Sequence, residues 1–329
     1  MSIVTVTAAD RAEFLNLVNA EIRPDHAKTN AWDDFPVILG ASNSHWQMVF
    51  KTGDGTIAGC IACLIRNHET SCGVFPIAGI GSVVTHPDFR GKGISTALQN
   101  EMLAKLMGKN IPLGVLWTDQ PEIYSGRGFE SAGWELHASV SELAISKPLN
   151  PLFRIRPYSP VDTPAIQMLF DAHPWRTVRE PDDANKYYGM PGTTGFVITN
   201  RENEILASAF CGKGGDFAQY ITEFCGDLHL LPHLFQFLWK NKLATQVLIP
   251  PGAEELVNIL VDLGSNWMTT PSGQWVVLNP DALAGLVAGA GGKIPENKEG
   301  PGAWLGNVGP DGMPIVGPIT TAIWGFDSV

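Results

Sequence analysis

The residues best suited to chemistry in this chain form a basic, glycine-rich turn at Arg90–Ser95, with the sequence RGKGIS. Gly91 and Gly93 would let the backbone approach a ligand closely, and the N-terminus of a following helix would add a partial positive charge. Backbone N–H groups in such a turn can surround an anion, and Arg90 and Lys92 add full positive charges. The turn predicts a phosphate-binding loop, although a surface turn without a ligand can have the same composition.

The spacing within this turn excludes two familiar nucleotide-binding loops. The Gly-Lys-Ser/Thr order of a P-loop is absent, and the glycines are not spaced as in the G-x-G-x-x-G fingerprint of dinucleotide-binding folds. About thirty residues later, a strand-like segment leads into a second pattern, Y-x-x-x-G-F, at Tyr124–Phe129. The pair of patterns is more informative than either pattern alone.

Together the two patterns resemble the GNAT acetyltransferase superfamily, in which R-x-x-G-x-G/A follows the fourth strand and Y-x-x-x-G-F follows the fifth. Arg90, Gly93 and Ser95 occupy the loop positions, with Ser95 in place of the usual glycine or alanine. The motif resemblance covers Ile80–Gly133, and the order of elements extends it to residues 1–146.

This resemblance implies acetyl-CoA binding. The pyrophosphate would lie on the glycine loop, and the pantetheine arm would pair with the fourth strand as an added strand. A neutral amine would attack the thioester directly, and a main-chain N–H near Val84 would stabilise the oxyanion. The residues assigned to the cofactor are Ser82, Val83, Val84, Arg90, Gly91, Lys92, Gly93, Ile94, Ser95 and Thr96.

The resemblance also implies catalytic roles. Tyr124 matches the tyrosine that, in many members, donates a proton to the leaving CoA thiolate, although it could also be a packing aromatic. Asp119 and Glu122 lie beside the end of the fifth strand. Either could deprotonate an ammonium acceptor, directly or through water, but acidic residues also occur commonly at helix starts.

Strands and helices of alternating type must position these residues. Apolar residues at helical spacing predict a helix through Phe14–Ile22, and a turn at Thr52–Gly55 predicts a hairpin. The remaining elements expected in this half are the polar link Asn67–Cys72, strand Phe75–Thr85, helix Ser95–Met107, strand Pro112–Thr118, a short helix near Glu122–Gly126 and a last strand Trp134–Ile145.

The order of elements then begins again after Lys147–Pro151. A repeat spacing near 150 residues predicts one fold used twice. We therefore expect an α/β protein of two tandem GNAT-like domains, each with a mixed central sheet flanked by helices, and the strand Gln274–Leu278 as the last of the second copy. The expected divisions are a catalytic domain at 1–146, a degenerate domain at 151–280, and a Gly/Pro-rich C-terminal extension at 281–329 packed on the domains.

The second copy lacks the chemistry of the first. The counterpart of the glycine loop, Cys225–Leu230, has no arginine, and Asp227 would repel a pyrophosphate. No tyrosine occurs between Pro250 and Gly264. In some tandem members of the resembled family the C-terminal carboxylate enters the active site as a base. The strand-like end Ile323–Val329 makes this a hypothesis here, with a frayed terminus as its alternative.

Charge and composition limit the partners. The chain has 22 Lys+Arg against 33 Asp+Glu, a net charge of −11, which disfavours nucleic acid and anionic membranes as main partners. No uncharged apolar run approaches the roughly 18 residues of a membrane-spanning helix, and no signal segment is evident, so we expect a cytoplasmic protein. Cys60 and Cys63 lie three apart in an apolar strand, which predicts two buried thiols on opposite faces. His229 and His233 lack a third ligand, so we predict no metal site.

The sequence thus predicts an acetyl-CoA-dependent N-acetyltransferase acting on a primary amine of a small molecule, as a monomer or homodimer. Two alternatives remain open: a CoA-binding sensor or scaffold without turnover, and a transferase that uses another acyl donor. The acceptor pocket is expected from Asp25–Ser44 and His173–Thr194. Its candidate aromatic residues, each of which could equally be packing, are Trp32, Phe35, Trp175, Tyr187 and Tyr188.

Overall fold

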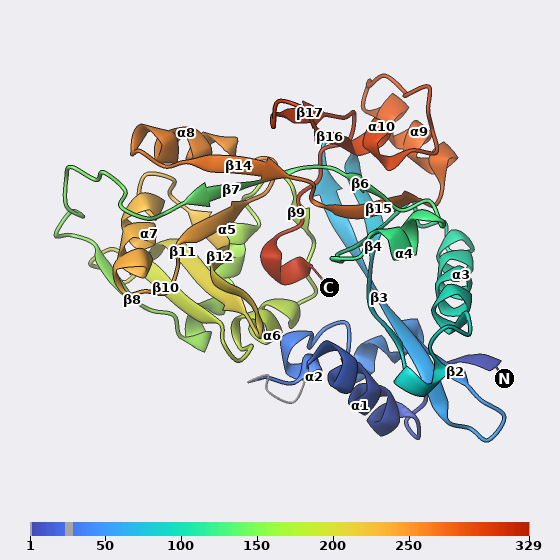
Figure 1. Cartoon of the computed structure of the whole chain (residues 1–329). Helices are drawn as coiled ribbons and strands as arrows, with labels where there is room; N and C mark the ends of the chain where they lie inside the picture. Colours follow the sequence, from blue (N-terminus) through green and yellow to red (C-terminus); the bar gives the residue numbers. More distant parts are fainter. Residues whose placement is uncertain (1, 24–28, 329) are drawn as a thin grey trace.

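A computed structural model describes residues 2–23 and 29–328 of the chain. In this part of the chain, strands gather into two large mixed sheets and a small hairpin, with helices against the faces of the large sheets (Figure 1). This confirms the predicted mixed α/β class. None of the described helices is long and apolar enough to cross a membrane.

The first sheet carries the candidate site. It has two long antiparallel strands at its centre, β3 and β4, whose register runs from Gly59 opposite Thr85 to Thr70 opposite Gly73. The predicted polar link Asn67–Cys72 is therefore wrong, because most of it continues β3 and pairs with β4 and β9. In order across the sheet, the strands are β1 (Ser2–Thr5), β2 (Gln47–Lys51), β3 (Ile57–Thr70), β4 (Gly73–Thr85), β5 (Leu113–Leu116), β15 (Gly273–Val277) and β6 (Glu130–Ala132), with β9 (Arg176–Thr177) beside β3.

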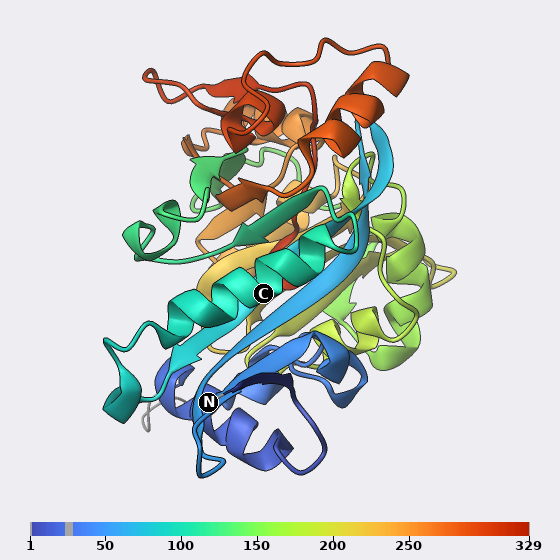
Figure 2. The ribbon, with the colours of Figure 1, turned by 90° about the vertical axis from the view of Figure 1, so that its right-hand side faces the viewer.

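Helices α1 (Arg11–Ile22) and α3 (Ile94–Met107) cover opposite faces of this sheet. Figure 2 shows α3 lying along β3 and β4. The two cysteines of β3 follow the same division: Cys60 packs in the core that contains Phe14 of α1, and Cys63 in the core that contains Leu98 of α3. The prediction of two buried thiols on opposite faces is confirmed.

The second sheet repeats the strand order of the first, and the two sheets exchange one strand. Read from its other edge, it runs β8 (Arg154–Pro157), β10 (Thr194–Thr199), β11 (Ile205–Lys213), β12 (Asp216–Gly226), β13 (Gln246–Ile249), β7 (Glu135–Ser139) and β14 (Trp267–Thr270). β7, from the first half of the chain, lies between β13 and β14, whereas β15, from the second half, lies between β5 and β6.

This exchange corrects two expectations. The predicted strand Trp134–Ile145 does not close the first sheet, and Gln274–Leu278 does not belong to the second. Gly133, with a φ of +64°, separates β6 from β7, and its N–H donates to the carbonyl of Gly306. The chain leaves the first sheet at this glycine. Trp275 of β15 is fully buried in the first sheet.

The segment after β15 packs on both halves. Trp304 and Ile319 are buried against the first sheet, and Trp324 and Phe326 join a core that includes residues of both halves. The predicted strand character of the last residues is wrong, because Gly325–Asp327 form a 3₁₀ turn, η4, which lies between the halves (Figure 1). The elements here are α9 (Pro280–Gly289), α10 (Pro301–Leu305), β16 (Gly306–Val308), β17 (Pro314–Val316) and η4.

The other helices cover the remaining faces and connections. In the first half they are α2 (Ala31–Asp34), η1 (Ala41–Trp46), η2 (Pro87–Phe89) and α4 (Glu122–Ser125); in the second they are η3 (Pro160–Asp162), α5 (Thr163–Phe170), α6 (Asp183–Tyr188), α7 (Leu231–Lys240) and α8 (Glu254–Asp262).

Candidate functional site

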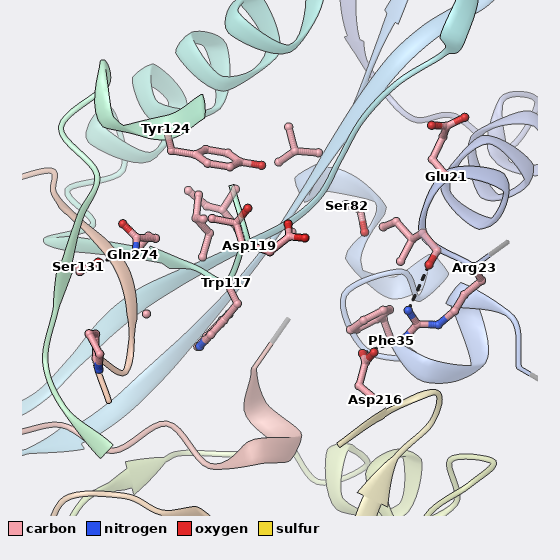
Figure 3. Close-up of a pocket in the computed structure, with 18 residues that line it drawn as sticks. Glu21, Arg23, Phe35, Ser82, Trp117, Asp119, Tyr124, Ser131, Asp216 and Gln274 are labelled. Atoms are coloured by element: carbon pink, nitrogen blue, oxygen red, sulfur yellow. Dashed lines mark hydrogen bonds and ion pairs between the residues drawn. The ribbon is translucent and has the colours of Figure 1, made fainter. Parts of the chain in front are cut away.

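The candidate site lies where two parallel strands separate. β4 and β5 pair only where Ile77–Gly79 lies opposite Leu113–Val115. Beyond that point a cavity of about 900 Å³ opens between Ile80–Val83 on β4 and Leu116–Asp119 after β5 (Figure 3). Its volume is in the range of small-molecule and cofactor sites.

β4 is irregular along the wall of this cavity. The β3–β4 register passes from Ala62 opposite Gly81 to Cys60 opposite Val84, so Ser82 and Val83 form a bulge. Ser82 has a φ of +52°, an uncommon conformation for a residue other than glycine. Backbone groups of a bulge are outside the regular ladder. An extended ligand could therefore hydrogen-bond to the predicted pantetheine-binding segment.

The glycine loop lies at the N-terminus of α3. Gly91 and Gly93 have φ values of +74° and +75°, and a Cβ added at either would meet no atom within 4 Å. The loop from Arg90 to Gly93 is exposed, and Gly93 caps α3 without a side-chain hydrogen bond. The first N–H groups of α3 are thus open to an anion.

The basic side chains of the loop have partners within the chain. Lys92 Nζ donates to the carbonyl of Asp88 at 3.0 Å and lies 4.7 Å from the centre of the Phe89 ring. Arg90 forms an ion pair with Glu21, near the end of α1. Both cations are on the exposed side of the loop.

Arg127, which the sequence analysis did not single out, joins the loop to the tyrosine segment. It donates to the hydroxyl of Thr96 in the first turn of α3 and, at 2.7 Å, to the carbonyl of Ile123 in α4. Ser95 accepts a hydrogen bond from Gln99 at 2.8 Å, and Ile94 is buried beneath the loop. The arginine within YSGRGF was the available signal for this link.

Tyr124 lines the cavity from α4 (Figure 3). Its ring packs edge-on against Phe129, with 6.0 Å between ring centres. Burial raises the pKa of the Tyr124 phenol, and the nearby charges of Arg127 and Asp119 act in opposite directions on it. The hydroxyl therefore holds its proton at neutral pH, as a general acid must.

The structure separates the two candidate bases. Asp119 is exposed and lines the same cavity as Tyr124. Glu122 is exposed on the first turn of α4, and it is not among the described residues that line the cavity. Among the described residues, geometry thus brings Asp119, rather than Glu122, to the cavity that Tyr124 lines.

The far wall of the cavity was missed by sequence reasoning. Glu21 and Arg23 come from the end of α1, and Asp216 comes from the second half of the chain (Figure 3). Arg23 bonds to Asp216 at 2.8 Å and to the buried Asp34 at 2.6 Å, so an ion-pair chain joins the two halves across the wall.

The predicted acceptor aromatics divide into three groups. Phe35 lines the main cavity. Tyr187 is buried and lines two small neighbouring cavities, whereas Tyr188 is buried in the core. Trp32 and Trp175 are partly buried and pack against the core. Part of the predicted segment, residues 25–28, lies outside the described residues.

The end of the chain lies beside the cavity. Asp327 lines a small cavity that shares Trp117 with the main one, and Ser328 lines another that shares Phe35 with it. Lys213 donates to the Ser328 hydroxyl at 2.7 Å. Val329, whose carboxylate was the hypothetical base, lies outside the described residues.

The second half has no comparable loop in its described residues. Between β12 and α7, the Asp227 carboxylate accepts a hydrogen bond from the His229 N–H at 2.8 Å, so a carboxylate occupies the position of the anion. His229 precedes α7 and is not on the same helix as His233. The described residues hold no group of three or more potential metal ligands.

Comparisons with known proteins agree with this geometry. The profile of a family described as "Acetyltransferase (GNAT) domain" matches residues 3–132. A search among curated proteins found no match.

Solved structures of similar fold cover most of the chain. A GCN5-related N-acetyltransferase from Anabaena variabilis has a TM-score of 0.61 at 14% identity, over 84% of this chain and 73% of its own. One from Kribbella flavida has a TM-score of 0.63 at 16% identity, over 86% and 72%. Eis1 from Mycobacterium abscessus has a TM-score of 0.59 at 13% identity, over 87% and 76%. These likenesses concern the fold.

Proposed function

The chain belongs to the GNAT acetyltransferases through its domain at residues 3–132, and from that premise we propose that it transfers an acetyl group from acetyl-CoA to a primary amine of a small molecule. The observation that carries the proposal is the cavity between the separated strands β4 and β5. The glycine loop follows β4 and the short η2 helix in the chain, and Tyr124 lines the cavity from α4 (Figure 3).

The cofactor would be held largely by backbone groups. The exposed N–H groups at the start of α3 suit a pyrophosphate, with Arg90 and Lys92 as neighbouring cations. The bulge at Ser82 and Val83 suits an extended pantetheine arm. The thioester would then lie in the cavity, near the main-chain N–H of Val84 proposed as oxyanion donor.

The acceptor amine must lose a proton, and the departing thiolate must gain one. Asp119 is the proposed base, acting on an ammonium directly or through water, because it lines the cavity. The neutral amine forms the new C–N bond, and the C–S bond breaks as the acetyl group leaves CoA. Tyr124 donates its proton to the CoA sulfur, for which its raised pKa suits it, and the second proton, which the nitrogen loses once the C–N bond has formed, restores the phenol.

The carboxylates of the cavity support a cationic acceptor. Glu21, Asp119 and Asp216 line it beside Arg23, which is already paired with acidic partners. The described lining thus holds three acidic side chains and one basic side chain, and this excess of negative charge favours an ammonium group over an anionic acceptor.

Release of free CoA thiol, measured with acetyl-CoA and a panel of primary amines, tests the proposal. We expect amine-dependent release, and a loss of about 10²–10⁴-fold in kcat for Tyr124→Phe. Tyr220→Phe is the matched control, because Tyr220 lies on β12 and does not line the cavity.

Three results would point elsewhere. Binding of CoA without turnover on any amine would favour a sensor or scaffold, and turnover only with a longer acyl-CoA would favour another donor. Equal rates for Tyr124→Phe and wild type would exclude Tyr124 as the acid.

A further inference from the structure

The ion pair between Arg90 and Glu21 connects the two ends of the candidate site. Arg90 belongs to the loop proposed for the pyrophosphate, and Glu21 lines the cavity proposed for the acceptor (Figure 3). The arginine side chain is 61% exposed and the glutamate 19%. An arginine so exposed is free to change partner.

Glu21 has no second ion-pair partner in the described part of the chain. Arg90 is the one ion-pair partner of Glu21 among the described residues. The nearby Arg23 is already paired with Asp34 and Asp216. Glu21 also lies in the last turn of α1, where the helix dipole disfavours a negative charge. Loss of Arg90 would leave a carboxylate facing the cavity and in need of a cation.

A pyrophosphate is a stronger partner for Arg90 than Glu21 is. An exposed ion pair contributes little because water screens it and two side chains must be ordered. A diphosphate offers several charged oxygens, already oriented by the N–H groups of α3. When the anion binds, Arg90 therefore gains by leaving Glu21.

We propose that the cofactor's pyrophosphate displaces Glu21 as the ion-pair partner of Arg90, and that the released Glu21 carboxylate binds the cationic group of the acceptor. This inference rests on the proposed function and goes beyond it by assigning Glu21 as an acceptor-binding residue that becomes available once the cofactor is bound. By thermodynamic linkage, the cofactor and the acceptor should therefore each tighten the binding of the other.

Calorimetric titration of the full chain with desulfo-CoA tests the exchange. Glu21→Gln should tighten binding about three- to tenfold, because Arg90 no longer has to leave a carboxylate. Arg90→Gln should weaken desulfo-CoA binding about tenfold. The double variant Arg90→Gln/Glu21→Gln should bind no more tightly than Arg90→Gln alone. Glu101→Gln is the matched control, since it removes an exposed carboxylate on α3 that has no bonded partner among the described residues.

An equal effect of Glu21→Gln in both backgrounds would overturn the exchange, because a charge acting through space does not need Arg90. So would unchanged binding in Glu21→Gln alone. Failure of wild-type protein to bind desulfo-CoA would instead refute the proposed function, which keeps the two failures distinct.

Steady-state kinetics test the second half of the inference. With the amine of the panel that releases most thiol, Glu21→Gln should raise the KM for the amine at least fivefold and leave kcat within twofold. Glu101→Gln should change neither constant. An unaltered KM in Glu21→Gln would exclude the acceptor role of Glu21.

Discussion

A buried ionic cluster beside the cavity makes a sharp prediction about stability. Arg179 is 1% exposed and forms ion pairs with Glu223 and Asp327, which are 1% and 2% exposed. Its guanidinium donates to the two Asp327 oxygens at 3.1 and 3.0 Å, and its Cζ lies 3.9 Å from the centre of the Phe170 ring. The Tyr188 hydroxyl adds a 2.7 Å bond to Glu223. The cluster fastens the end of the chain to β12.

Replacing Arg179 with methionine leaves both carboxylates buried without their cation. Breaking a buried pair in this way costs about 3–5 kcal/mol. An independent value comes from protonation: where one proton taken up at pH 7 is shared by the two carboxylates, starting from an ordinary carboxyl pKa near 4, the cost is about 4 kcal/mol. The two values agree, so we expect Arg179→Met to lower the free energy of unfolding by about 4 kcal/mol at pH 7.

The protonation argument also fixes the pH dependence. Burial raises the pKa of Glu223, and Arg179 opposes this effect, so losing Arg179 raises that pKa further. In the variant, the buried carboxyl binds a proton in the folded state that the unfolded state does not bind, so acid favours folding relative to wild type. The deficit should shrink by about 2 kcal/mol between pH 7 and pH 5.5.

Urea unfolding of both proteins at the two pH values measures this difference. Titration of groups common to both proteins cancels in the comparison. Arg179→Met/Asp327→Asn should recover part of the loss, because it removes one of the two stranded charges. A deficit below about 1 kcal/mol at pH 7, or one that is the same at both pH values, would refute the reasoning.

Three further outcomes follow from the fold and the loop. Gly93→Ala should lower the free energy of unfolding by about 1 kcal/mol through the positive φ alone, because the new methyl group meets no neighbour. The same variant should bind desulfo-CoA more weakly in calorimetry, and unchanged affinity would contradict the loop assignment. A protein of residues 1–146 should be unfolded by circular dichroism because it lacks β15 between β5 and β6; a cooperative thermal transition would contradict this. Burial lowers the pKa of His68 from 6.5 to about 4. Between these pH values the unfolded state binds a proton that the folded state does not, so the free energy of unfolding should fall by up to ~3 kcal/mol from pH 6.5 to pH 4. His68→Gln should show a shallower pH dependence in urea unfolding, and equal slopes for the two proteins would exclude His68 as the cause.

The sequence was informative where structure is set locally. The amphipathic stripe predicted α1, the turn at Thr52–Gly55 predicted the β2–β3 hairpin, and the glycine loop precedes α3 as expected. In each case the signal and the contact that it predicts lie within about fifteen residues. The positive φ at Gly93 and the helical spacing after it are properties of a short segment, so they can be predicted from a single sequence.

The strand exchange could not be predicted in the same way. β7 has the alternation of a half-buried strand, but alternation does not state which sheet a strand joins, and β15, with the sequence GQWVV, does not alternate. Gly133 separates β6 from β7, and a single glycine is not distinguishable in sequence from one in an ordinary bulge. The pairings of β15 with β5 and of β7 with β13 join residues more than a hundred positions apart. Such pairings depend on packing that no local pattern records.

The same limit explains the missed half of the site. Glu21 and Arg23 read as ordinary charges near the end of a surface helix, and Asp216 as the polar end of a strand. They become parts of one wall only because the second half packs against α1, where Arg23 meets Asp216.

The exchange also gives the second half a function that its own loop does not supply. The Asp227 carboxylate accepts the hydrogen bond of the His229 N–H, so this N–H is not available to a phosphate. Through β15, however, the second half places Gly273 and Gln274 in the cavity of the first half, and through β12 it places Asp216. Because β15 lies between β5 and β6, removing it would also disturb the strand that carries Trp117 and Asp119 at its end. The second half of the chain therefore forms part of the wall of the cavity in the first half.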